Sequence, residues 1–242
     1  MASEGNVEIG GAKPTARRAG LNAELIVAQA VQLTKQRGLD GWSIRDLALE
    51  LGVVPSVVYH YFPKKDDVVD AVVEHVYSLV KLPDPHLEWK EWFMELCLAM
   101  RPLLLKYHGV ADRLSVGWLA ESALPAIDLA AAKLQDAGFG ALTPLAYSMV
   151  FNVAVGAIAA RDRRSPKAKN PQDMESMIAR LQPMAEQSPG LNLMVRSLLE
   201  PLTDTARAAD VSDEYFRLIV ESLIDGVEHV VLPRARRQAH VI

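Results

Sequence analysis

The chain has 242 residues, of which 50% are hydrophobic and 6% aromatic, and its formal net charge is −4. This length allows one large or two modest domains with buried cores, and the acidic balance argues against a general affinity for nucleic acid. The single cysteine, Cys97, excludes an internal disulfide and a cysteine-cluster metal site. No apolar run reaches the length of a membrane span and the first twenty residues lack a signal-peptide core, so the sequence predicts a cytoplasmic protein without a membrane partner.

Residues 1–20 are predicted to form a disordered basic arm, and a first helix is predicted to follow it over 23–37. Asn22 can cap that helix and Gly38 can end it. The basic side chains of the arm could lie along DNA phosphates or enter the minor groove, and a tail that only aids solubility is the alternative. Those side chains belong to Lys13, Arg17 and Arg18.

The segment 43–65 has the pattern of a helix-turn-helix. Ser43 can cap a helix, and Asp46 stands where a capping box places its carboxylate. Gly52 permits a sharp turn, and Pro55 suits the first turn of a second helix, where its missing N–H is no loss. Such a unit is typically used to place a short helix in the DNA major groove.

Val58 and Phe62 lie four residues apart and can anchor the second helix of this motif inward. The opposite face carries hydroxyl, aromatic and imidazole groups, which can bond phosphates and reach base edges. Two lysines open the next helix, predicted over 65–80, where free N–H groups and the helix dipole also favour phosphate. The outward residues and these lysines are Pro55, Ser56, Val57, Tyr59, His60, Tyr61, Lys64 and Lys65. The alternative is a helical pair inside an ordinary α-helical protein.

Pro83 and Pro85 interrupt the chain after this helix. They mark the predicted boundary between a DNA-binding domain over 21–82 and a second all-helical domain over 83–242. The helices predicted in the second domain cover about 89–107 with a kink at Pro102, 110–118, 122–138, 143–161 and 213–231, the last stopped by Pro233. Residues 162–170 are predicted to form an exposed loop, and Asn170-Pro171 to start a short helix.

Two of these helices, 143–161 and 213–231, are apolar over more than one stripe. A helix of this kind needs burial on two sides, either within the chain or against a second copy of it. We favour a four-helix dimer interface, because a two-fold protein matches a palindromic operator whose half-sites lie a helical turn apart.

The segment from Asn22 to about Val80 resembles the DNA-binding domain of the tetracycline-repressor (TetR) family of bacterial transcription regulators. The matching stretches are IVAQAVQLTKQRGLDGWSIRDLALELGV and VVYHYFPKKDDVVDAV. The resemblance implies phosphate contacts from Ser43, Tyr59, Tyr61 and Lys65. The resemblance also implies base contacts from Arg45, Pro55, Ser56, Val57 and His60. Val54 departs from the pattern, because the family usually caps the recognition helix with Ser or Thr; losing such a cap costs about 1 kcal/mol.

The resemblance also implies a homodimer whose second domain holds a small effector that releases DNA. The candidate wall residues are Trp92, Leu96, Met100, Leu114, Trp118, Leu145, Met149 and Asn152; Trp and Met suit an adaptable apolar pocket, and plain core packing is the alternative for each. Leu96, Leu114 and Ala160 or Arg161 stand where the tetracycline branch has its hydrogen-bonding Asn, metal-binding His and metal-binding Glu. A tetracycline–Mg²⁺ ligand is therefore not expected, and neither a metal nor another cofactor is predicted.

The sequence thus predicts an all-α, sequence-specific DNA-binding transcription regulator. We expect a homodimeric repressor that binds a palindromic operator and is released by a small, largely apolar effector. The alternatives are a ligand-independent DNA-binding protein and an activator. An enzyme is not expected, because the chain has no G-x-x-x-x-G-K-[ST], G-x-S-x-G or H-E-x-x-H motif.

Overall fold

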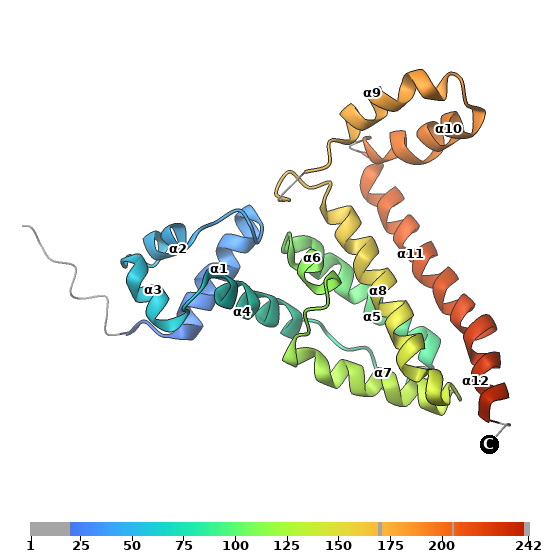
Figure 1. Cartoon of the computed structure of the whole chain (residues 1–242), viewed down its shortest axis with the longest axis horizontal. Helices are drawn as coiled ribbons and strands as arrows, with labels where there is room; N and C mark the ends of the chain where they lie inside the picture. The colour runs from blue at the N-terminus through green and yellow to red at the C-terminus, as the bar shows by residue number, and fades with distance from the viewer. Residues whose placement is uncertain (1–19, 169–170, 205, 240–242) are drawn as a thin grey trace, which may run out of the picture.

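The computed structural model describes residues 20–168, 171–204 and 206–239 of the chain. Within these residues the structure is helical and contains no strand, which confirms the predicted all-α class. Figure 1 shows a small group of helices at the N-terminal end, joined through α4 to a larger group that holds the rest of the chain. The predicted basic arm lies outside the described residues.

The N-terminal group consists of four helices, and its helix starts fall where the sequence predicts them. α1 begins where the Asn22 side chain accepts a 2.8 Å hydrogen bond from the Leu25 N–H, and it ends at Gly38, whose φ is 79°. The buried Trp42 indole donates to the Thr34 hydroxyl at 3.0 Å, which fixes the connection after α1. The four helices are α1 (Ala23–Arg37), α2 (Ile44–Glu50), α3 (Pro55–Tyr61) and α4 (Lys65–Ser78).

The helix-turn-helix is closed by local contacts that the sequence predicts. The Ser43 N–H donates to the Asp46 carboxylate at 2.7 Å, and the Asp46 N–H donates back to the Ser43 hydroxyl at 3.2 Å, which completes a capping box. Gly52 has a φ of 66°, in the left-handed region that glycine enters without steric cost. Ala48 is buried, so α2 and α3 can approach closely at this small side chain.

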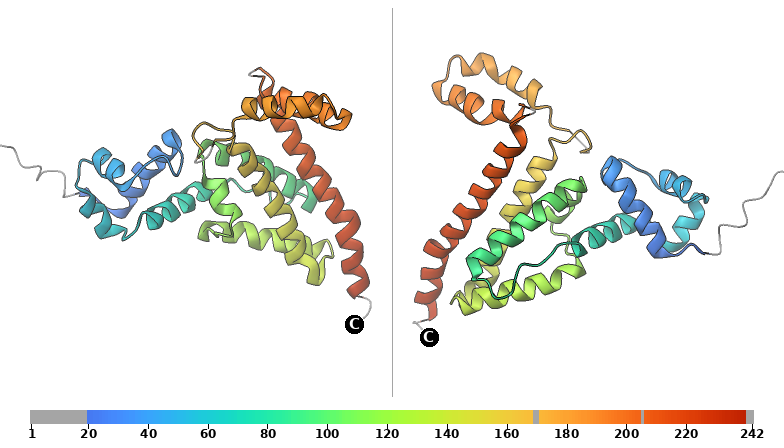
Figure 2. Two further views of the ribbon diagram at one scale, coloured as in Figure 1. Left: turned by 45° about the horizontal axis from the view of Figure 1, so that its top comes forward. Right: turned by 180° about the vertical axis from the view of Figure 1, so that it is seen from behind.

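The second group is built around α8, which packs against α5, α6, α7 and α11. Figure 2 shows α9 and α10 projecting as a pair from the end where α8 and α11 meet them. The helices of this group are α5 (Trp89–Lys106), α6 (Val110–Ser115), α7 (Leu124–Asp136), α8 (Thr143–Asp162), α9 (Met174–Ala185), α10 (Pro189–Met194), α11 (Ala208–Gly226) and α12 (Leu232–Ala239).

Several helix boundaries differ from the prediction, among them the end of α6 at Ser115 instead of about 118 and the start of α11 at Ala208 instead of about 213. Pro233 does not stop the last helix, because a wide π-helical turn over Val227–Val231 precedes it. The proline lies at the second position of α12, directly after this π-helical turn. α9 begins at Met174, and its cap is Asp173, whose carboxylate accepts from the Ser176 N–H at 3.0 Å.

The apolar segment that contains α8 is longer than predicted. By length and composition, Gly140–Asp162 could cross a membrane, so the prediction that no run is long enough is wrong. In the structure this helix carries a stripe of fully buried residues, among them Val150, Val155 and Ile158. Because these residues pack against the surrounding helices, the high apolar content is explained in part by core formation.

α8 and α11 also carry apolar residues that the described part of the chain leaves about half exposed. On α8, Leu145 and Val153 are 52% and 42% exposed, and on α11, Tyr215 and Leu218 are each 50% exposed. The opposite face of α11 is buried through Phe216 and its neighbours. Each of these helices thus buries one apolar face and leaves another exposed, and burial of the second face against a partner stays a prediction.

Candidate DNA-binding face and its link to the second domain

The recognition helix of the motif, α3, is held by its inward side chains and not by a cap. Val54 precedes it and makes no side-chain capping bond, while Pro55 occupies the first turn. Val58 is completely buried and Phe62 is half-buried, as their spacing predicts. These anchors leave the other side of the short helix facing solvent.

The outward residues of α3 differ in their exposure and in whether their polar groups form hydrogen bonds within the protein. Ser56 and His60 are exposed, and Tyr59 is 48% exposed. The Tyr61 hydroxyl donates to the Leu21 backbone carbonyl at 2.8 Å, so this tyrosine ties α3 to the start of α1. Two further predicted contact residues, Pro55 and Val57, are half-buried.

Two of the predicted phosphate-contact residues at the starts of α2 and α4 already interact with other side chains of the protein. The Ser43 hydroxyl donates to the Asp46 carboxylate at 2.6 Å within the capping box. The Lys65 ammonium lies 4.8 Å from the centre of the Trp42 ring, in cation–π contact. Arg45 and Lys64 are exposed. All ten predicted DNA-contact residues lie on α2, α3, the start of α4 or the residues that cap these helices, at one end of the molecule (Figure 1).

α4 connects this end to the second group of helices through buried contacts and ion pairs. Its last turns bury Val76 and Tyr77 in the common hydrophobic core. Asp70 accepts from the Arg113 guanidinium of α6 at 2.7 Å, and this bond raises the pKa of that guanidinium. The Glu74 carboxylate accepts from two backbone N–H groups just before α7, at 2.7 and 2.8 Å. A shift of α6 or α7 would therefore move α4 directly.

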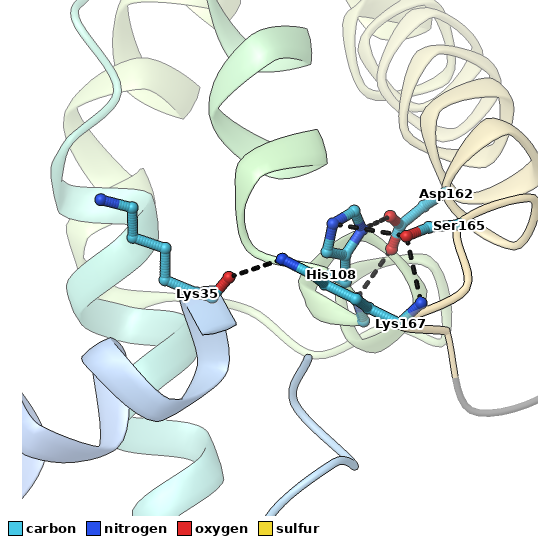
Figure 3. Close-up of polar contacts among 6 residues, drawn as sticks. Lys35, His108, Asp162, Ser165 and Lys167 are labelled. Atoms are coloured by element: carbon cyan, nitrogen blue, oxygen red, sulfur yellow. Dashed lines mark hydrogen bonds and ion pairs between the residues drawn. The ribbon is translucent and has the colours of Figure 1, made fainter. Parts of the chain in front are cut away.

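A second connection joins the end of α8 to the end of α1, and no pattern in the sequence predicts it. Asp162 is only 1% exposed, and its carboxylate accepts from the Gly109 N–H at 2.7 Å while lying 2.5 Å from Nδ1 of His108. Figure 3 shows this group, with Ser165 beside the other ring nitrogen of His108. The prediction that 162–170 is an exposed loop is therefore wrong at Asp162.

The same group holds the backbone at the C-terminal end of α1. The His108 carbonyl accepts from the Leu39 N–H at 2.8 Å, and the Lys167 ammonium donates to the Lys35 carbonyl at 3.3 Å (Figure 3). Gly38 leaves room for this approach, because a Cβ there would collide with the Lys167 carbonyl oxygen. We call His108, Asp162 and Lys167 the α1 clamp.

The eight predicted effector-wall residues do not share one environment. Four of them belong to the tightly packed core, with exposures between 0 and 4%: Trp92, Leu96, Met100 and Leu114. Trp118 and Met149 are half-buried. Leu145 and Asn152 are exposed on α8 and face away from the core that holds the other helices, so their place in an effector wall stays a prediction.

The same core also contains buried polar atoms that have no hydrogen-bond partner among the described residues. They include the Tyr77 hydroxyl and the Trp92 indole N–H. Burial raises the pKa values of Tyr77, Cys97 and Tyr147, the last two to about 12, so these groups are neutral at physiological pH. Buried donors without a partner are costly, and an incoming ligand could satisfy them.

Comparison with known proteins agrees with this arrangement. Residues 26–72, which cover most of α1 to α4, match the family described as bacterial regulatory proteins, tetR family. An HTH-type transcriptional regulator of Saccharopolyspora erythraea is 31% identical over 143 residues, which is 58% of this chain and 61% of that protein. Residues 26–72 thus match the DNA-binding region of the TetR family, and the comparisons together support a TetR-family regulator.

Two solved structures with a TetR-like fold are similar in structure to most of the chain. The TetR family protein ActR of Streptomyces coelicolor, in complex with actinorhodin, has a TM-score of 0.65 and 22% identity and covers 86% of this chain and 96% of its own. BioQ with its double-stranded DNA operator has a TM-score of 0.55 and 23% identity and covers 75% of this chain and 99% of its own. At these identities the likeness concerns the fold. The match to the S. erythraea relative spans less than two thirds of that protein.

Proposed function

We propose that this TetR-family protein is a sequence-specific DNA-binding transcription regulator, and that it acts as a homodimeric repressor. The observation that carries the proposal is α3, a short helix anchored by Val58, whose opposite face presents Ser56, Tyr59 and His60 to solvent. Side chains of this kind bond phosphates and base edges when such a helix enters the major groove. The operator complex of BioQ supports a DNA partner for the same fold.

We further propose that a small, largely apolar effector releases the protein from its operator. The core between α4, α5 and α8 supports this role, because its neutral groups Tyr77 and Trp92 offer unpaired donors within an otherwise apolar surrounding. Two routes lead from this core to the DNA-binding face: α4 itself and the α1 clamp at the end of α8. The actinorhodin complex of ActR supports a small-molecule partner for the fold. Activation in place of repression is the alternative outcome of the same DNA binding.

The proposed division of contacts gives a first prediction. Lys65→Ala should weaken binding to all DNA sequences by a similar factor and lower the slope of log affinity against log salt by about 1, because one phosphate contact is lost. Ser56→Ala should instead change the relative affinity among operator variants. Fluorescence anisotropy across a salt series and a panel of single-base variants measures both effects.

Arg180→Ala is the matched control, because Arg180 is exposed on α9, in the group of helices that does not contain α3. Its affinity and salt slope should equal those of the wild type. Unchanged binding by both Lys65→Ala and Ser56→Ala would contradict the placement of the DNA contacts. Thermal unfolding confirms that each variant is folded.

A further inference from the structure

A cavity of about 270 Å³ lies between α5, α8, α9 and α11, and its charged lining consists of three arginines. A second cavity of about 310 Å³ adjoins it and shares Arg161 and Arg164 with it. Figures 1 and 2 show α9 lying beyond the end of the bundle where α8 ends and α11 begins. Neither cavity is lined by any of the eight residues predicted to hold the effector.

The first arginine, Arg101, is fixed and nearly buried at 8% exposure. Its guanidinium donates to the Asp213 carboxylate and to the Ser212 carbonyl and hydroxyl, the latter two at 3.0 and 2.9 Å, and it lies over the Phe216 ring. The Nε–H of the same guanidinium is buried and has no partner among the described residues. A buried charged donor left unpaired is costly, so an additional acceptor at this position would be stabilising.

The other two arginines have no compensating carboxylate. Among the described residues, no Asp or Glu lies within ion-pair distance of Arg161 or Arg164. Burial, together with the charges of Arg161 and Arg101, lowers the pKa of Arg164. Two carboxylates, Asp173 and Glu175, line the adjoining cavity; the Asp173 oxygens accept from the Ser176 N–H and hydroxyl at 3.0 and 2.5 Å, and neither carboxylate lies within ion-pair distance of Arg161 or Arg164. Arg161 and Arg164 therefore bring positive charge to the cavity that no ion pair among the described residues neutralises.

The remaining wall is apolar and partly aromatic, and includes Met174, Met177, Tyr215, Phe216 and Ile219. Methionine side chains adapt to ligands of different shape, and aromatic faces contribute a large apolar contact area. An inorganic anion would use only the arginines, whereas a neutral apolar molecule would leave them unpaired.

We propose that this cavity binds a small organic anion, namely a carboxylate attached to an aromatic or branched aliphatic body. The carboxylate lies between Arg161 and Arg164, which can hold it by charge-assisted hydrogen bonds, and the body contacts Met177 and Tyr215. Both arginines flank Asp162 in the chain, so an occupied cavity acts on the same end of α8 that carries the α1 clamp. That last consequence rests on the proposed regulator function, whereas the binding itself does not.

Isothermal titration calorimetry of the full chain tests the proposal without DNA. We use 2-naphthoate as the probe, 2-naphthamide as its uncharged counterpart and inorganic phosphate as an anion without an apolar body. The naphthoate should bind at least about tenfold more tightly than the amide and should weaken as salt is raised, because a charged hydrogen bond is worth about a factor of ten or more. Equal affinity for naphthoate and naphthamide, or no binding of naphthoate, would overturn the proposal, and equal affinity for phosphate would contradict the organic class of ligand.

Substitutions locate the site. Arg161→Met and Arg164→Met keep much of the side-chain volume and should each lower the affinity for naphthoate about tenfold, while Arg180→Met, outside both cavities, should leave it unchanged. Thermal unfolding shows whether each variant is folded, and two conservative variants are used because Arg101 is tied into the core. If Arg161→Met and Arg164→Met both bind naphthoate as the wild type does, the ligand lies elsewhere and the proposal is wrong. Because no DNA is present, this failure is distinct from failure of the regulator function.

Discussion

Replacing both Val153 and Leu218 by aspartate is expected to convert the protein to a monomer and to lower its operator affinity by more than about a hundredfold, since linked half-site binding contributes factors of 10²–10⁴. Both residues are exposed, at 42% and 50%, so the charges should not unfold a single chain. In a two-fold interface, however, each replacement places uncompensated carboxylates against apolar surface. Analytical ultracentrifugation measures the oligomeric state, and fluorescence anisotropy measures DNA binding.

The spacing of the neighbouring residues indicates why this face should self-associate. On α8, Met149, Val153, Gly156 and Ala160 follow one stripe at intervals of three and four residues, and two of the four are small enough for close helix approach. Leu119→Asp is the control, because Leu119 is 60% exposed but lies outside α8 and α11. A double variant that remains dimeric would show that subunits associate through another surface.

Asp162→Ala should lower the free energy of unfolding by about 3 kcal/mol, because it leaves the Gly109 N–H and the His108 ring without their buried partner. It should also loosen the end of α1, since the His108 carbonyl holds the Leu39 N–H. Urea unfolding measures the first effect. Amide hydrogen exchange at Gly38 and Leu39 measures the second, with faster exchange expected in the variant.

The control for this prediction is another aspartate–basic pair of the same region. Asp112 accepts from the Arg163 guanidinium at 2.7 Å, but both side chains are about half exposed. Asp112→Ala should therefore cost less than about 1 kcal/mol. A loss from Asp162→Ala no larger than this would mean that the α1 clamp contributes little to holding the two groups of helices together.

The helix-turn-helix could be predicted in detail because its boundaries depend on neighbouring residues. Asn22, Ser43 and Pro55 define helix starts through bonds or ring geometry within one turn, and Gly38 and Gly52 provide positive φ where the chain reverses. The same local reasoning fails at Pro233, where a π-helical turn rearranges the preceding backbone and allows helix to continue.

The α1 clamp and the arginine cavity could not be predicted because their residues meet only in the folded chain. His108 and Asp162 are 54 residues apart, and helical periodicity carries no information about such pairs. Arg161-Asp162-Arg163-Arg164 has the composition of an exposed loop, yet it places Asp162 in the core, Arg163 on the surface, and Arg161 and Arg164 at a cavity. The exposure of Leu145 and Asn152 could not be predicted either, because it depends on how α8 is oriented against the other helices.

Selection of bound sequences from a random DNA pool tests the central claim most directly. The full chain should enrich a palindrome whose half-sites are centred about 10 base pairs, or a multiple of that, apart, because the two α3 helices of a dimer enter successive major grooves. Val57→Ala, which alters a side chain placed to touch a thymine methyl, should change the preferred base within each half-site and leave the spacing unchanged. Enrichment of no sequence, or of one without two-fold symmetry, would contradict a dimeric regulator that reads DNA through α3.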